Sequence, residues 1–105
     1  MKSITRQEEQ ILLAIHNLGD EAYLITVREK IKDFTGKYFS VGTIYAPLNR
    51  LDKLGYLETY YGDANAIRGG KAKKFYRITK QGYDALAEIK EQHDMMWQGL
   101  AIPKI

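Results

Sequence analysis

The sequence contains no cysteine, only two prolines and no long hydrophobic run. The absence of cysteine excludes disulfide bonds and thiolate metal sites. No apolar stretch approaches the roughly 20 residues that a membrane-spanning helix needs, so we expect no membrane partner. The first residues are polar and charged rather than an apolar leader, so we expect no signal peptide and a cytoplasmic location.

Residues typical of catalysis are also scarce. The two histidines, His16 and His93, are far apart in the sequence and lack the spacing of metal ligands. The two serines are Ser3 and Ser40, and Ser40 occupies a position typical of a helix cap. We therefore expect no catalytic residue, no metal site, no cofactor and a protein that is not an enzyme.

The composition that is present fits one small globular domain. The chain has 105 residues, of which 45% are hydrophobic and 28% charged, the ordinary balance of a folded protein. Its net charge of +3 is unevenly distributed, because residues 50–80 carry eight basic and three acidic side chains, whereas residues 81–105 are net acidic. A basic middle segment suits a polyanion-binding surface. Charge alone does not distinguish it from a solvated, lysine-rich loop.

The hydrophobic spacing predicts four helices and one hairpin. Thr5 and Glu8 have the spacing of a capping box, and Gly19 ends the helix that they begin. Helices are expected at about 25–34, 40–54 and 80–98, and strands at 56–61 and 74–78. Phe34 and Val41 are expected to face the core, and Pro47 to distort the third helix locally. Three helices followed by a hairpin predict a winged helix-turn-helix of mainly α, α+β class.

The third helix has the two faces of a helix that binds in a DNA groove. Its apolar residues fall on one side of the helix. The side chains on the other side are small near the start of the helix and polar or cationic further on. Asn49 and Arg50 can form paired hydrogen bonds with base edges, and Tyr45 at the flank can reach a phosphate. An ordinary solvated face is the alternative, but the basic hairpin that follows disfavours it. The predicted DNA-contacting set is Ser40, Gly42, Thr43, Tyr45, Ala46, Asn49, Arg50 and Lys53.

The loop of the hairpin is the predicted wing. It is rich in glycine, which admits unusual backbone shapes, and in cations, which neutralise phosphates or enter a minor groove. A nucleotide-binding loop is excluded because Ala72 follows Gly70 and Lys71. A solubilising loop tip is the alternative. The predicted wing residues are Arg68, Gly69, Gly70, Lys71, Lys73 and Lys74.

Three segments resemble PadR-like transcriptional regulators: EQILLAI at 9–15, SVGTIYAPLNRLDKLGYL at 40–57 and RGGKAKKFYRITKQG at 68–82. The resemblance covers roughly residues 5 to 90. It implies a dimeric repressor that binds double-stranded DNA at a palindromic operator, and in many members releases it on binding a small aromatic effector. The usual glycine after Tyr23 is absent, so the second helix is expected to start differently. The single final helix is similar to the short subfamily.

The last helix carries a heptad-like stripe with no later element to cover it. Such a stripe favours pairing with a second copy of the chain, and the resemblance adds the first helix to the interface. We expect residues 1–79 to form the DNA-binding part and 80–105 a dimerisation helix and tail of the same domain. The expected dimer interface is Ile11, Tyr83, Leu86, Ile89, Lys90, His93, Met96, Trp97 and Leu100.

Trp97 is the only tryptophan of the chain. Some members of the resembled subfamily hold planar drugs between paired tryptophans of this helix, which implies an effector site at Trp97, Met96 and His93. The alternative, favoured by the rarity of ligand sites among aromatic stripes, is that Trp97 and Met96 fill the dimer core. At the level of function, the alternative to a DNA-binding regulator is a winged-helix module that binds another protein through its basic face.

Overall fold

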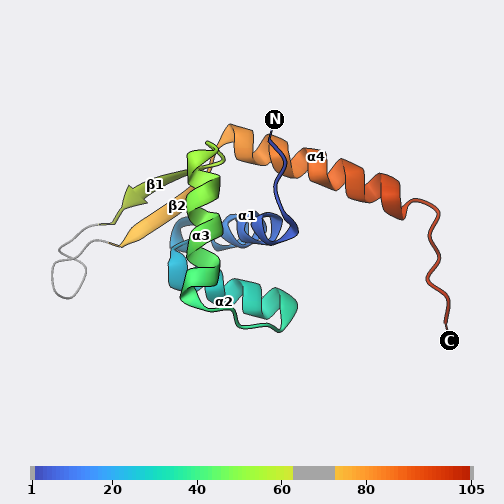
Figure 1. The fold of residues 1–105 in the computed structure, drawn as a ribbon, viewed down its shortest axis with the longest axis horizontal. Helices are drawn as coiled ribbons and strands as arrows, with labels where there is room; N and C mark the ends of the chain where they lie inside the picture. The colour runs from blue at the N-terminus through green and yellow to red at the C-terminus, as the bar shows by residue number, and fades with distance from the viewer. Residues whose placement is uncertain (1, 63–72, 105) are drawn as a thin grey trace.

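The structure, a computed structural model, describes residues 2–62 and 73–104. Four helices and one hairpin follow each other in the predicted order (Figure 1). The chain therefore has the expected α+β winged-helix fold. The elements are α1 (Arg6–Leu18), the short 3-10 turn η1 (Gly19–Glu21), α2 (Leu24–Thr35), α3 (Val41–Lys53), β1 (Leu57–Tyr61), β2 (Lys74–Ile78) and α4 (Lys80–Trp97).

Local hydrogen bonds explain where the helices begin. The amide of Glu8 donates to Thr5 Oγ1, and the amide of Thr5 donates back to Glu8 Oε1, so the predicted capping box is present. Ser40 caps α3, which then runs without interruption through Pro47. α2 begins at Leu24, one residue earlier than predicted. No helix of the described residues has both the length and the apolar character needed to cross a membrane.

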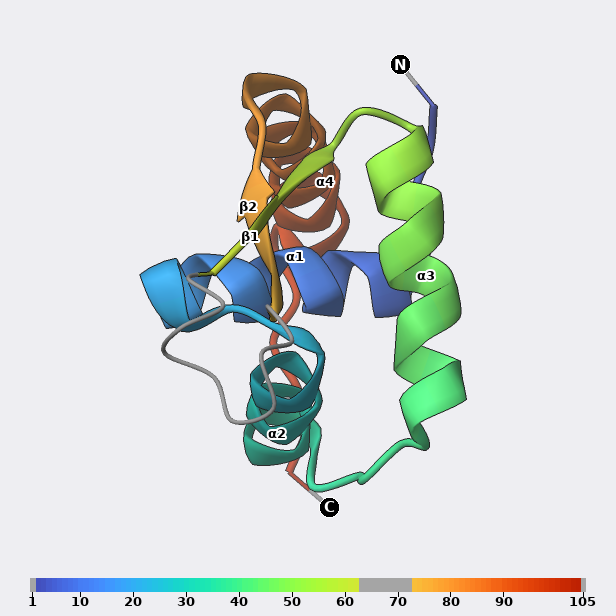
Figure 2. The same cartoon turned by 90° about the vertical axis from the view of Figure 1, so that its left-hand side faces the viewer.

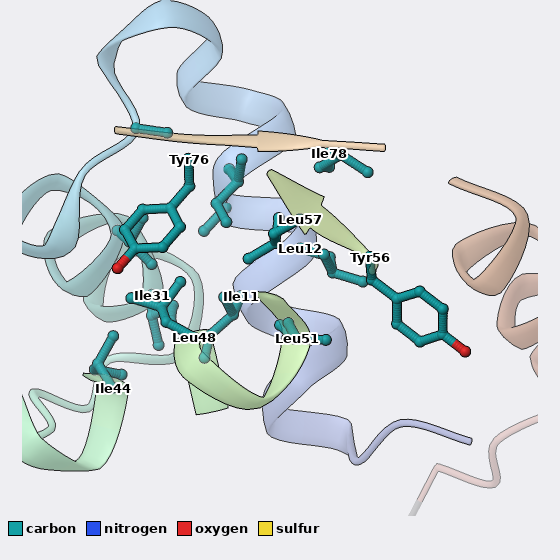
Figure 3. Packing of buried hydrophobic residues seen from close by; sticks show 14 of the residues in the cluster. Ile11, Leu12, Ile31, Ile44, Leu48, Leu51, Tyr56, Leu57, Tyr76 and Ile78 are labelled. Atoms are coloured by element: carbon teal, nitrogen blue, oxygen red, sulfur yellow. The ribbon is translucent and has the colours of Figure 1, made fainter. Parts of the chain in front are cut away.

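The hydrophobic core lies where the first three helices meet the hairpin (Figure 3). α3 contributes Ile44, Leu48 and Leu51, which follow the helical period and are fully buried. Val41 and Phe34 were wrongly expected in this core, because both are substantially exposed. They lie at the end of α2 and the start of α3, on either side of the connection that joins these two helices (Figure 2).

The two strands form an antiparallel ladder that runs from the Leu57–Ile78 pair to the Tyr61–Lys74 pair. The amide of Gly62 donates to the carbonyl of Lys73, which closes the base of the loop between the strands. β2 is also attached to the body of the protein, since the amide of Tyr76 donates to the carbonyl of Ala22. One of these hydrogen bonds thus closes the loop end of the hairpin, and the other attaches β2 to the segment before α2.

Only the first half of α4 packs on the core. The amide of Thr79 donates to the carbonyl of Tyr56, and Gly82 lets the helix approach that carbonyl closely. A Cβ atom at position 82 would lie 2.3 Å from the oxygen of Tyr56. Ala85 is buried, but the last turns of α4 extend away from the other elements (Figure 1). The fold thus leaves an exposed helix end on one side and the hairpin on the other.

Candidate nucleic-acid interface

α3 lies at the edge of the molecule, and no other helix or strand of residues 2–62 and 73–104 covers its outer side (Figure 2). Its apolar stripe points inwards, so the residues of the opposite face are available to a partner. The exposed members of the predicted set are Ser40, Gly42, Thr43, Tyr45, Ala46, Arg50 and Lys53, and Asn49 is half-buried. The structure therefore brings the predicted recognition residues together on one helix face, with the exception of the Arg50 guanidinium.

The guanidinium of Arg50 contacts α1. Its Nη1 donates to both carboxylate oxygens of Glu8, at 2.6 Å to Oε2, and its Nη2 lies 3.4 Å from the carbonyl of Ser3. The side chain of Glu8 is only 3% exposed, whereas that of Arg50 is 47% exposed. The expected contact of Arg50 with base edges thus competes with an intramolecular ion pair.

The N-terminal end of α3 adjoins a groove that the sequence reasoning missed. Arg6 at the start of α1 and Lys37 after α2 place two cations there, close to Thr43. The exposed amides of a helix start also favour an anion. The signal was present in the sequence, because Lys37 lies three residues before the Ser40 cap. The groove is lined by Arg6, Gln7, Gln10, Phe34, Thr35, Lys37, Phe39 and Thr43.

The base of the wing carries two of its predicted cations. The Lys73 ammonium lies 4.2 Å from the centre of the Tyr23 ring, and that of Lys74 lies 5.6 Å from the Tyr76 ring. Arg77, which is not among the predicted wing residues, forms an ion pair with Glu58 across the hairpin, with 2.7 Å between Arg77 Nε and Glu58 Oε1. The other predicted wing residues, Arg68, Gly69, Gly70 and Lys71, lie outside the described residues.

The phenol of Tyr76 lies beneath α3 and remains neutral. Burial, followed by the nearby Tyr45, Asp52 and Tyr61, raises the pKa of Tyr76 to about 12. Figure 3 shows its ring extending from β2 towards Ile31 and Ile44. The buried ring of Tyr76 thus lies against the inner, apolar side of α3, and it carries no charge that a ligand could contact.

The predicted dimer residues of α4 fall into two groups. Leu86 packs partly on the core, Tyr83 hydrogen-bonds His16 Nδ1 at 3.0 Å, and His93 lies 3.9 Å from Glu9. These three side chains thus make contacts within the chain, and Ile89 is half-buried beside the N-terminal segment. The more exposed members are Lys90, Met96 and Trp97, with Trp97 at 59%, and Leu100, which lies in the segment after α4 because the helix ends at Trp97.

The expectation that Ile11 lies in the dimer interface is wrong. Ile11 is fully buried in the core of the chain, so its side chain has no surface to offer a partner. The expectation came from the resemblance, which adds the first helix to the interface, whereas the helical spacing of Ile11 matches the inward side of α1. Met95, which the stripe did not include, is also strongly exposed on the last turns of α4.

The comparison with known proteins agrees with this geometry. The sequence profile of the PadR-like family of transcriptional regulators matches residues 11–88. The chain belongs to the PadR-like family. A relative from Lysinibacillus sphaericus, described as an uncharacterized protein X, is 36% identical over 92 residues, which cover 79% of this chain and 82% of the relative.

Solved structures of other transcriptional regulators show a similar fold. A transcriptional regulator from Clostridium thermocellum is 26% identical, with a TM-score of 0.71 over 87% of this chain and 85% of the other. A PadR-like transcriptional regulator from Bacillus cereus is 27% identical, with a TM-score of 0.70 over 85% and 82% of the two chains. The protein is therefore a winged-helix transcriptional regulator of a DNA-binding family, and the family is not one of enzymes.

Proposed function

We propose that the chain is a dimeric repressor that binds a palindromic operator through α3 and the wing. The observation that supports this most is the uncovered polar face of α3, with a cation-bearing hairpin on the same molecule. A helix of this kind can enter the major groove, while the hairpin follows the neighbouring phosphates. Blocking a promoter in this way would repress transcription.

The contacts divide into those that read sequence and those that add affinity. Asn49, on the outer side of α3, has the chemistry to pair with an adenine edge. Lys53 and the wing lysines Lys73 and Lys74 have the chemistry to neutralise phosphates, which contributes affinity for any sequence. Lys53 takes part in no salt bridge with the described residues, which makes it available for such a contact.

The dimer is proposed to form through the projecting half of α4. Met96 and Trp97 are exposed there, as is Leu100 in the segment that follows, and the described residues of the same chain do not cover them. A second copy related by a two-fold axis would bury both stripes at once. Two α3 helices could then enter successive major grooves, which requires a separation of about 34–36 Å.

The release signal is proposed to be a planar aromatic compound at the paired Trp97 side chains. Two exposed indoles that face each other across the axis can hold a flat ring between them, with Met96 as an adaptable neighbour. The compound would lower DNA affinity only by preferring a dimer whose α3 helices are wrongly spaced. Because Trp97 is the only tryptophan, its fluorescence during titration with planar dyes and phenolic acids reports on this site alone.

A gel shift with duplex DNA from upstream of the protein's own gene tests the DNA-binding proposal. Binding should weaken steeply between about 50 and 200 mM salt, as expected when several phosphates are neutralised. An affinity that does not change with salt would contradict the proposal. It would favour a module that binds another protein through the basic face.

A further inference from the structure

We propose that Arg50 serves DNA recognition as a positioning residue, which fixes α3 on α1 through Glu8, and not as a reader of bases. The proposal rests on the proposed function, because it concerns how α3 is presented to DNA. It assigns to the arginine of the recognition helix a role opposite to the one that its sequence position suggests.

The first support is the burial of Glu8. Its side chain is 3% exposed, and a carboxylate removed from water needs a cation or several hydrogen bonds to remain charged. Arg50 Nη1 contacts both of its oxygens, and the amide of Thr5 donates to Oε1 at 2.8 Å. One carboxylate therefore joins the capping box of α1 to the last turn of α3.

The second support is the N-terminal segment, which is attached at the same place. Nη2 of Arg50 lies 3.4 Å from the carbonyl of Ser3, and the hydroxyl of Tyr56 donates to the carbonyl of Lys2 at 2.6 Å. Residues before α1 thus connect to α3 and to the start of the hairpin. The end of α3 that carries Asn49 and Lys53 is held by charged and polar contacts in addition to its apolar side.

The third support is what would follow if the guanidinium of Arg50 left the carboxylate of Glu8. A contact between Arg50 and a base would have to break the ion pair and leave Glu8 buried without its cation. Lys53, on the same helix, forms no salt bridge with the described residues, so a contact with DNA would not break one. The two cations of this turn are therefore assigned different roles, positioning for Arg50 and phosphate contact for Lys53.

The test uses the full-length protein and a duplex enriched from a random-sequence pool by the wild type, with a random duplex of equal length for comparison. Glu8→Gln removes the charge but keeps a side chain that suits a capping box. If Arg50 acts through Glu8, then Glu8→Gln and Arg50→Ala each weaken the enriched duplex by roughly tenfold. The double variant should lose no more than the worse single variant.

Two further readouts separate positioning from direct contact. The base preferences of Arg50→Ala, obtained by repeating the selection, should match those of the wild type at every position. The salt dependence should keep its slope in Arg50→Ala, whereas Lys53→Ala should reduce the slope by about one phosphate contact. The proposal is overturned if Glu8→Gln leaves affinity unchanged or raises it while Arg50→Ala relaxes the preference at one base pair.

A measurement without DNA keeps this inference distinct from the proposed function. Amide hydrogen exchange over α3 should rise in Glu8→Gln and in Arg50→Ala, and Arg50→Lys should restore part of the protection. Glu9→Gln is the matched control, because Glu9 is the neighbouring carboxylate on α1 and faces His93. If the wild type enriches no duplex, the proposed function fails, and unchanged exchange in both variants overturns the positioning role by itself.

Discussion

Helices α3 and α4 are both amphipathic, but the apolar side of α3 faces the core of its own chain, whereas apolar residues at the end of α4 face solvent. α3 buries Ile44, Leu48 and Leu51 in the core of its own chain and leaves its polar face uncovered. The second half of α4 leaves Met96 and Trp97 exposed, as is Leu100 in the segment that follows, after a first half that packs on the core. The exposed side of α3 therefore suits a polar, charged partner, and that of α4 an apolar one.

The difference follows from what packs against each helix. α3 packs with its inner side against α1, α2 and the hairpin, so its apolar side meets three elements (Figure 2). α4 meets the core only near Ala85 and Leu86, after which the described chain offers it little further apolar surface. The comparison predicts that changes on α4 affect assembly, whereas changes on the outer face of α3 affect DNA binding with little effect on the fold.

The largest expected effect comes from placing charge on the exposed stripe of α4. Trp97→Lys combined with Leu100→Lys should give a folded monomer, since neither side chain is part of the core of its own chain. Loss of the second DNA-binding unit should lower operator affinity by about 100-fold or more. Sedimentation, thermal unfolding and a gel shift measure the three effects.

Met95→Lys is the matched control for that variant. Met95 is equally exposed, but it lies on the side of α4 opposite the stripe. It should leave both the dimer and the affinity intact. A dimer that survives the double substitution, or that is lost in Met95→Lys, would place the interface elsewhere.

The second prediction compares two glycines in the first turns of α3 and α4. Gly82→Ala should destabilise the protein by about 2–3 kcal/mol or more, because the new methyl group collides with the backbone oxygen of Tyr56. Gly42→Ala meets no atom within 4 Å and should stabilise the fold by up to about 0.5 kcal/mol. Urea unfolding of both variants gives the two free energies, and equal effects would contradict the packing described for α4.

The sequence predicted the elements well because their signals are local. Thr5 and Ser40 cap helices as expected, and the 74–78 strand was predicted with its observed ends. The failures concern tertiary packing. Periodicity cannot tell whether an apolar residue such as Val41 lies beyond the core. The expectation for Ile11 came from the resemblance, although its spacing on α1 matches the buried side of that helix.

The site was predicted at the level of the helix face but not of every side chain. Arg50 has the position of a base-reading residue on α3, yet its partner Glu8 is 42 residues earlier in the chain. No local pattern links the two, because their contact depends on how α1 and α3 cross. The same limit applies to Arg6, which only the fold brings to the groove beside α3, whereas Lys37 has a local signal in its position just before the Ser40 cap.

The third prediction concerns the support beneath α3. Tyr76 has a pKa of about 12 in the fold, against 10.0 for an ordinary tyrosine, chiefly because burial disfavours the phenolate. The neutral phenol thus contributes stability that is fully present below pH 10 and is lost as the pH rises from 10 to about 12. The total loss should not exceed about 2–3 kcal/mol. Urea unfolding across this range measures it, and Tyr76→Phe should show less of the decline; an unchanged decline would assign it to other groups.

The smallest expected effect is that of a single phosphate contact at the wing. Lys73→Ala should weaken the enriched duplex and a random duplex by the same few-fold factor, and should reduce the salt slope by about 0.9, because a phosphate contact carries no sequence information. Its ammonium lies over the Tyr23 ring, so a slight loss of stability should accompany the change. Lys104→Ala, which makes the same charge change in the exposed tail beyond α4, is the control and should leave the slope unaltered. Equal slopes for the two variants would show that the base of the hairpin does not contact DNA, and would restrict the DNA-binding surface to α3 and the groove beside it.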